Sequence, residues 1–315
     1  MPLPVNMEFI IPISGSKNKS KPLFRDKDCF KAPAVPELTI PLLSNPDTLL
    51  KEAIFMSESK QCRPLFLAIR WAVRLVYPKT TVVGAENLPD DACIAVGNHA
   101  QMHGPIVGEL YYPRKRLTWC AAQMQKLKEV PAYAYQDFWS GKPPRVRWFY
   151  RLASYIIAPL SVCIFNNAAV IPVYHDNRVI STFRQTVKAL EEGVDVIIFP
   201  EKLEKRNQIL YQFQENFVDV AKLYYKRTGK RAAFVPMYLA PALRQLHIGT
   251  PVVFDPEAPI ADERKRICAE MARAITSIAE SLPEHTVVPY ENMPKRQYPK
   301  NIPCEVNPDH EKTCG

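Results

Sequence analysis

Short apolar runs alternate with longer amphipathic stretches through the middle of this chain. Helical periodicity predicts helices at Val179–Glu192, Ile209–Arg227 and Asp262–Leu282. Strands that alternate with helices are typical of a layered domain built on a parallel sheet. We therefore expect an α/β fold with a central, largely parallel sheet of about seven strands flanked by helices. The predicted strands are Thr80–Val83, Ala92–Val96, Leu117–Ala121, Ala169–Tyr174, Val194–Phe199, Ala233–Leu239 and Pro251–Phe254.

Two segments lie outside this alternation, and both combine arginines with apolar or aromatic residues. A helix over "RPLFLAIRWAVRLVYP" (63–78) would place Arg63, Arg70 and Arg74 on one face. The stretch "RVRWFYRLASYIIAPLSVCIF" (145–165) begins with arginines and aromatics, which favour a membrane interface. Its apolar part, Leu152–Phe165, is interrupted by Pro159 and is shorter than a helix needs to span a bilayer. The alternative is that both helices cover a soluble core.

The ends of the chain differ from its middle. Residues 1–45 are rich in proline, show no regular period, and predict an extended N-terminal arm. Residues 46–78 predict a helical, membrane-facing segment, 79–282 the α/β domain, and 283–315 an extended C-terminal tail. We find no internal repeat.

The charge and the cysteines indicate which partners and which cellular compartment to expect. With 41 Lys and Arg against 32 Asp and Glu, the net charge of +9 favours an anionic partner. The basic residues are thinly spread and form no nucleic-acid recognition module, so we expect no nucleic acid as partner. Eight cysteines without a Cys-x-x-Cys pair predict reduced thiols, and the N-terminus has no secretory signal pattern. We expect a cytoplasmic protein, peripheral on the inner face of the membrane.

Four stretches occur in an order that resembles a known enzyme family. They are "TVVGAENLP" (81–89), "VGNHAQMHGP" (96–105), "AAVIPVYHDNRVISTFRQTVKALEEGVDVIIFPE" (168–201) and "FVPMYLAP" (234–241). Their order and spacing resemble the glycerolipid acyltransferases, that is, the lysophosphatidic acid acyltransferases and their relatives. The resemblance covers residues from about 78 to 255.

The resemblance implies that His99, preceded by Asn98, is the general base. A neutral imidazole suits the removal of a proton from an acceptor hydroxyl near pH 7. The family places an aspartate five positions later to orient the imidazole, and Gly104 stands there. His103, Glu109 or Glu201 could replace it. If only the carboxylate is missing, a Gly104→Asp substitution should raise turnover.

The family's third motif, Phe-Pro-Glu-Gly-Thr-Arg, corresponds to "FPEKLEKRN" (199–207) here. Phe, Pro and Glu match, whereas the glycine and arginine that help to hold the acceptor phosphate are replaced. Lys202 and Arg206 could still bind an anion, although a lysine does not reproduce a bidentate arginine. His175 occupies the place of the second motif's arginine, with Arg178 three residues on. The alternatives are a solvated charged loop and a surface histidine.

These observations predict an acyltransferase that moves a fatty acyl group from acyl-CoA or acyl carrier protein to a lysophospholipid or glycerol-phosphate-like hydroxyl. We expect no bound cofactor or metal; the membrane surface and the acyl carrier protein are the expected partners. A catalytically inactive acyltransferase fold that binds lipid or acyl carrier remains open. A metal site at His99 and His103 lacks a third ligand and has Ala100 where zinc proteases have glutamate. The candidate catalytic residues are His99 and Glu201, and the candidate substrate-binding residues are Asn98, His103, His175, Arg178, Lys202 and Arg206.

Overall fold

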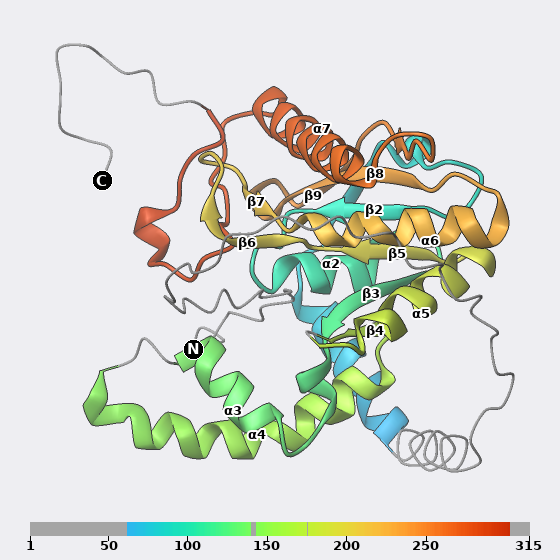
Figure 1. Ribbon diagram of the computed structural model, residues 1–315. Helices are drawn as coiled ribbons and strands as arrows, with labels where there is room; N and C mark the ends of the chain where they lie inside the picture. The colour runs from blue at the N-terminus through green and yellow to red at the C-terminus, as the bar shows by residue number, and fades with distance from the viewer. Residues whose placement is uncertain (1–61, 140–142, 175, 303–315) are drawn as a thin grey trace, which may run out of the picture.

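The computed structural model describes residues 62–139, 143–174 and 176–302, which form a layered α/β domain (Figure 1). The described sheet has eight strands in the order β1-β9-β8-β2-β5-β3-β4, and β10 pairs with the beginning of β8. Strands β8, β2, β5, β3 and β4 all run parallel, which confirms the predicted architecture. The strands are β1 (Thr81–Val83), β2 (Ile94–Gly97), β3 (Arg116–Ala121), β4 (Val170–Val173), β5 (Asp195–Ile198), β8 (Ala233–Ala240), β9 (Gln245–Ile248) and β10 (Val252–Val253).

Side chains of each central strand alternate between two apolar layers, as the two-residue period of a strand requires. In β2, Ile94 and Val96 face one layer, while Ala95 faces the other. The first layer is covered by α5 (Val179–Glu191), α6 (Asp219–Thr228) and α7 (Ile260–Ser281). The second layer is covered by α2 (His103–Tyr111). Both faces of the sheet are therefore buried, and polar chemistry is confined to its edges.

The hairpin of β6 (Glu201–Lys205) and β7 (Tyr211–Phe213) corrects part of the predicted helix Ile209–Arg227. Tyr211 and Phe213 are buried on one side of the extended chain, with the less buried Gln212 between them. That is a strand period, and the helix begins only at Asp219. The predicted strand list also missed β9, which runs antiparallel to β8.

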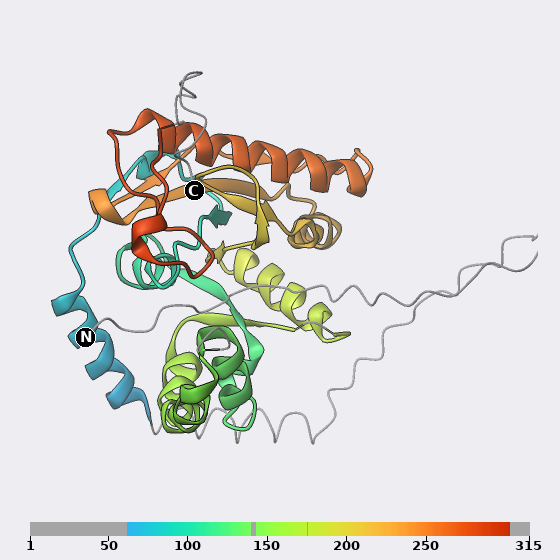
Figure 2. The ribbon, with the colours of Figure 1, turned by 90° about the vertical axis from the view of Figure 1, so that its left-hand side faces the viewer.

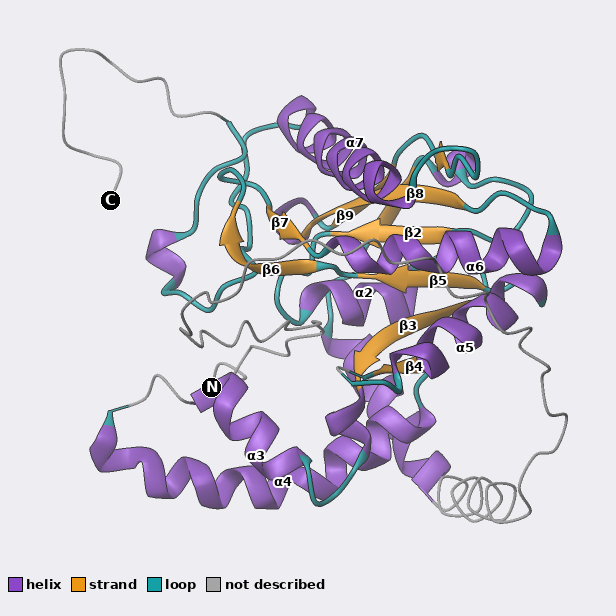
Figure 3. Ribbon diagram, in the orientation of Figure 1, coloured by secondary structure: helices purple, strands orange, loops and turns teal. Residues whose placement is uncertain are grey.

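Two helices extend from the sheet at its β4 side, where α3 (Val130–Ala134) packs on α4 (Arg147–Asn167) (Figure 3). A third helix, at 62–76, meets the end of α4, because the Cys163 thiol donates to the Cys62 carbonyl at 3.4 Å. In length and composition, Pro144–Asn167 would suffice to cross a membrane, unlike any other helix in the described ranges. From the sequence we expected no helix long enough to span a membrane. The 1–45 arm lies outside the described residues.

The chain after α7 turns back across the end of the sheet (Figure 2). Val287 and Tyr290 are buried, and the backbone N–H of Val287 donates to the Pro299 carbonyl at 2.9 Å. The predicted extended tail at 283–315 is thus packed against the domain as far as residue 302. The rest of that tail lies outside the described residues.

Candidate functional site

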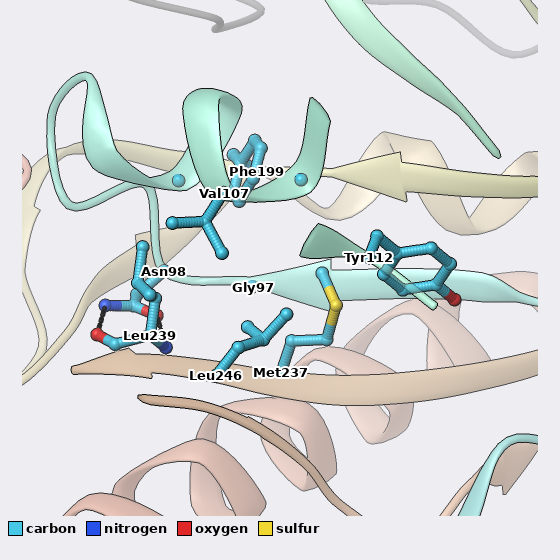
Figure 4. A pocket seen from close by; sticks show the side chains of 10 residues that line it. Gly97, Asn98, Val107, Tyr112, Phe199, Met237, Leu239 and Leu246 are labelled. Carbon is cyan, nitrogen blue, oxygen red and sulfur yellow. Dashed lines mark hydrogen bonds between the residues drawn. The ribbon is translucent and has the colours of Figure 1, made fainter. Parts of the chain in front are cut away.

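The candidate site is a corner at the carboxyl end of β2, where the chain turns into α2. Asn98 ties this corner to the neighbouring strand β8 (Figure 4). Its amide nitrogen donates to the Leu239 carbonyl at 3.0 Å, and its amide oxygen accepts from the Leu239 N–H at 2.7 Å. Because both ends of the buried amide are bonded to backbone, Asn98 holds the turn against β8, and its role in substrate binding stays a prediction.

The turn after His99 has an uncommon backbone. Ala100 and Gln101 are consecutive non-glycine residues with positive φ, 44° and 55°. Each such residue costs on the order of 1 kcal/mol, and this conformation persists only where surrounding contacts enforce it. The N–H of Gly104 donates to the His99 carbonyl at 3.0 Å and closes the turn at the start of α2.

Gly104 stands at the position of the family's aspartate, and the corner has no room for a side chain there. A Cβ on Gly104 would lie 2.5 Å from the His99 carbonyl oxygen and 3.0 Å from the Phe199 ring. The nearer atom belongs to the backbone, so relieving the contact would move the turn itself. The prediction that Gly104→Asp restores a carboxylate to this site does not fit this geometry.

Glu201 reaches the corner from the end of β5, the strand beside β2. One carboxylate oxygen accepts the backbone N–H of His99 at 2.6 Å, and the other accepts that of Tyr211 at 3.0 Å. Burial raises the pKa of Glu201 to about 7, and these two hydrogen bonds oppose the rise. Glu201 therefore joins the His99 turn to the β6–β7 hairpin through backbone.

The other two groups predicted to orient His99 are bonded elsewhere. The Nδ1 atom of His103 lies 2.7 Å from the Tyr77 hydroxyl. Glu109 forms ion pairs with Arg116 and with Arg70, the latter at 2.9 Å. Because His99 and His103 have different surroundings, they do not form the predicted alternative metal pair. Within the ranges that the structure describes, no three His, Cys, Asp or Glu side chains form a metal-binding group.

The imidazole of His99 lies between aromatic rings and is 1% exposed. Phe199 contacts it edge-on with ring centroids 5.3 Å apart, and Tyr290 does so at 5.8 Å. Burial lowers the pKa of His99 to about 3, and a hydrogen bond with the Gln101 backbone opposes this. The imidazole is thus neutral at pH 7, but it is a weak base and is covered.

A small cavity lies beside the corner, between α2 and strands β2, β8 and β9 (Figure 4). Its volume is about 10 Å³, roughly what a single water molecule needs. Phe199, Met237 and Leu246 line it. The walls are apolar, as an acyl chain would require, but the cavity is far too small to hold one in this conformation.

The predicted anion-binding residues lie on two separate segments, the β6–β7 hairpin that begins at Glu201 and the turn after β4. Lys202 is paired with Glu204 at 2.6 Å, and Arg206 is exposed on the loop after β6. Arg178 is paired with Asp176 at 2.7 Å beyond the end of β4, which two strands separate from β2. At the usual strand spacing this places the ends of β2 and β4 about 14 Å apart. His175 lies outside the described residues.

Four residues at the corner were missed in the sequence: Tyr211 on β7 and Tyr290, Glu291 and Tyr298 in the C-terminal segment. The Tyr211 hydroxyl donates to the Glu291 carboxylate at 3.1 Å, and its ring lies 5.5 Å from that of Tyr290. The tyrosines in "VVPYENMPKRQY" (287–298) were the available signal. Aromatic residues in a proline-rich segment indicate that it packs on something.

No protein-family model matches the sequence, and no curated protein sequence matches it. One solved structure with a similar fold is the crystal structure of the 1-acyl-sn-glycerophosphate (LPA) acyltransferase PlsC from Thermotoga maritima. The two share 17% sequence identity with a TM-score of 0.39, over 74% of this chain and 84% of that one.

Proposed function

We propose that this protein binds an anionic lipid surface through α4 and holds an acyl lipid at the His99 corner without transferring the acyl group. The single observation that carries the proposal is the outward face of α4. Trp148, Tyr155 and Ile156 are 69%, 68% and 70% exposed there. Phe149, Leu152 and Leu160 extend the same stripe.

A helix that covers a soluble core buries its apolar face, whereas α4 exposes it. Its large apolar residues recur at intervals of three and four and point outward, whereas the residues it buries include Ser154, Ala158 and Ser161. An exposed apolar patch of this kind marks an interaction surface. The 62–76 helix adds Trp71 and Leu75, which are 65% and 64% exposed.

The charges near this face favour an anionic bilayer. Arg145, Arg147 and Arg151 begin the segment and are exposed, and the chain as a whole carries a net charge of +9. Basic side chains beside interfacial aromatics are attracted to anionic headgroups. Arg70, which the sequence analysis placed on the basic face of its helix, is engaged by Glu109 and contributes less.

We favour a helix that lies in the plane of the interface over one that crosses the bilayer. Ser161 donates to the Met124 carbonyl at 3.3 Å, and the Phe165 carbonyl accepts from Gln125 at 3.1 Å. The last turns of α4 are therefore bonded to the domain, and β4 follows within three residues of its end. A spanning helix would have to leave these partners.

The residues around His99 support the proposal that the protein does not transfer the acyl group. Gly104 supplies no carboxylate, and both oxygens of Glu201 hold backbone N–H groups. In serine proteases, loss of the carboxylate that orients the catalytic histidine lowers turnover by about 10⁴-fold. A buried imidazole with a pKa of about 3 also gains little by accepting a proton from a hydroxyl.

Acyl transfer is the second candidate, and one observation favours it. Three of the stretches that resemble the acyltransferases end side by side at the carboxyl ends of β2, β5 and β8, where Phe199 and Glu201 both contact His99. In that version His99 removes the proton of an acceptor hydroxyl, whose oxygen attacks the thioester carbonyl of acyl-CoA or acyl carrier protein. The carbon–sulfur bond then breaks, the new ester forms, and the leaving thiolate takes the proton back from His99. The reaction would require the corner to open.

Vesicle co-sedimentation tests the favoured proposal. The full chain should sediment with vesicles that contain phosphatidylglycerol or phosphatidylserine and should remain in solution with phosphatidylcholine vesicles. Equal binding to both kinds of vesicle would contradict the preference for anionic headgroups, although α4 could still bind the bilayer through its apolar side chains. No binding to either would contradict the role of α4.

A further inference from the structure

Residues 283–302, which we call the strap, cross the end of the sheet (Figure 2), and Tyr290 and Glu291 of the strap contact His99 and Gln101 of the corner. The strap leaves the end of α7, crosses the carboxyl edge of the sheet and returns to its own starting point. Thr286 and Lys300 form an antiparallel bridge between its two ends. It is thus a closed loop with a base beside α7 and a tip at the corner.

The base of the strap is firmly held. Asn301 is fully buried, and its amide nitrogen donates to the carbonyls of Ala279 at 2.8 Å and Leu282 at 3.2 Å. Its amide oxygen accepts the N–H of His285 at 2.7 Å. The His285 ring lies 2.8 Å from the Tyr238 hydroxyl on β8. These buried bonds fix both ends of the loop to the domain.

The tip is held by longer bonds, each of which is only partly buried. Gln101 donates to the Glu291 carbonyl at 3.3 Å and accepts from the Tyr298 hydroxyl at 3.1 Å. Glu291 itself is exposed, and it accepts from Tyr211 at 3.1 Å. Tyr290 is the buried member of the tip and lies edge-on against His99.

The tip also acts on the strained turn. Gln101, one of the two residues with positive φ, is the residue whose side chain the strap holds on both its nitrogen and its oxygen. Glu201 holds the same turn from inside the domain through the His99 N–H. Lifting the tip would remove one of the restraints on a turn that is itself unfavourable.

We infer that the strap is an autoinhibitory element: seated, it excludes a lipid ligand from His99, and the corner opens when the tip lifts from a fixed base. The less stable part of a structure opens first, and the tip has the longer, more exposed bonds. This inference rests on the proposed function in taking the corner as the ligand site, and it deepens that proposal by naming what controls access. It holds for binding with or without transfer.

Histidine labelling with diethyl pyrocarbonate, read by peptide mass spectrometry on the full chain, tests the strap. His99 and His285 are 1% and 3% exposed, so both should label slowly in the wild type, while the half-buried His247 provides the reference. In a Glu291→Ala/Tyr298→Phe double variant, which removes the side-chain bonds of the tip to Tyr211 and Gln101 but leaves the Tyr290 ring and the base intact, His99 should label at least about tenfold faster while His285 stays slow, since local opening controls access. Ile180→Ala, at an exposed residue on α5, is the control and should change neither.

His285 reports whether the base stays in place. If His285 accelerates together with His99, the base is not fixed and the inference is overturned. It is equally overturned if His99 does not accelerate in the double variant, or if wild-type His99 labels as fast as His247. Amide hydrogen exchange of β2 and β5 should stay slow in the variant, which separates strap opening from unfolding. Since no lipid is present, a failure of vesicle binding leaves this result standing.

Discussion

The Glu201 carboxylate accepts the backbone N–H of His99 at 2.6 Å from inside the domain. The same carboxylate accepts the N–H of Tyr211 with its second oxygen. Glu201, which matches part of a family motif, thus holds the His99 turn and the β6–β7 hairpin together. It supports the turn that carries the imidazole, and this accounts for its presence at the corner even if the corner does not catalyse.

The pKa of Glu201 predicts a specific dependence of stability on pH. Its value of about 7 lies above its ordinary value of 4.5, so the unfolded chain releases this proton before the folded protein does. The stability that Glu201 contributes is therefore complete below pH 4.5 and declines as the pH rises to 7, by on the order of 3 kcal/mol. Urea unfolding of the wild type and Glu201→Gln should show a difference in unfolding free energy that shrinks over this range.

His99 works in the opposite direction, which is why the variant is needed as the comparison. Its folded-state pKa of about 3 lies below its ordinary value of 6.5, so its contribution falls as the pH drops through this range. Between pH 4.5 and 6.5 the two effects offset each other in the wild type. A wild-type minus variant difference that is constant from pH 4.5 to 7 would show that Glu201 is not a buried carboxyl of raised pKa.

The close approach at Gly104 predicts a large effect of a single methyl group. Gly104→Ala should destabilise the protein by about 2 kcal/mol, as overpacking typically does, because the Cβ meets the His99 carbonyl. Gly108→Ala, one turn later in α2, is the matched control. Its Cβ meets only the end of the Ile197 side chain, at 3.2 Å, and alanine favours the helix by about 1 kcal/mol. Thermal unfolding should rank Gly108→Ala above Gly104→Ala, and the reverse order would refute the steric account.

The outward face of α4 predicts which residues are needed for lipid binding. Replacing Trp148, Tyr155 and Ile156 with serine should weaken sedimentation with anionic vesicles at least about tenfold, since each side chain contributes roughly 1.5–3 kcal/mol when fully buried. The control replaces Ile180, Leu203 and Val253, which are 54%, 64% and 49% exposed elsewhere on the domain. Similar losses in both variants would mean that nonspecific contacts of exposed apolar residues, and not this helix, account for binding.

The sheet could be predicted from the sequence because its signals are local. The run at Ala92–Val96 is apolar throughout, as expected of a strand buried on both faces, and β2 is the centre of the observed sheet. The hairpin after Glu201 was missed because its first strand, "EKLEK", is charged and mostly exposed, and resembles a loop. Its partner strand follows an apolar stretch that also fits a helix.

The candidate site could be predicted only in part. The position of His99 after a strand, and that of Glu201 after another, follow from the motifs, and the sheet places the two strands side by side. The motifs do not predict that Glu201 accepts two backbone N–H groups, because the direction of a carboxylate depends on which N–H groups surround it. The strap could not be assigned either, since Tyr290 lies 191 residues from His99 and only the folded chain brings their rings together.

The most direct test of the central claim is CoA release from an acyl-CoA in the presence of lysophosphatidic acid and anionic vesicles. We expect the wild type and a His99→Ala variant to release CoA at the same rate as vesicles without protein, while both sediment with the vesicles. Release by the wild type that disappears in His99→Ala would contradict this account and would establish His99 as the base of an acyl transfer.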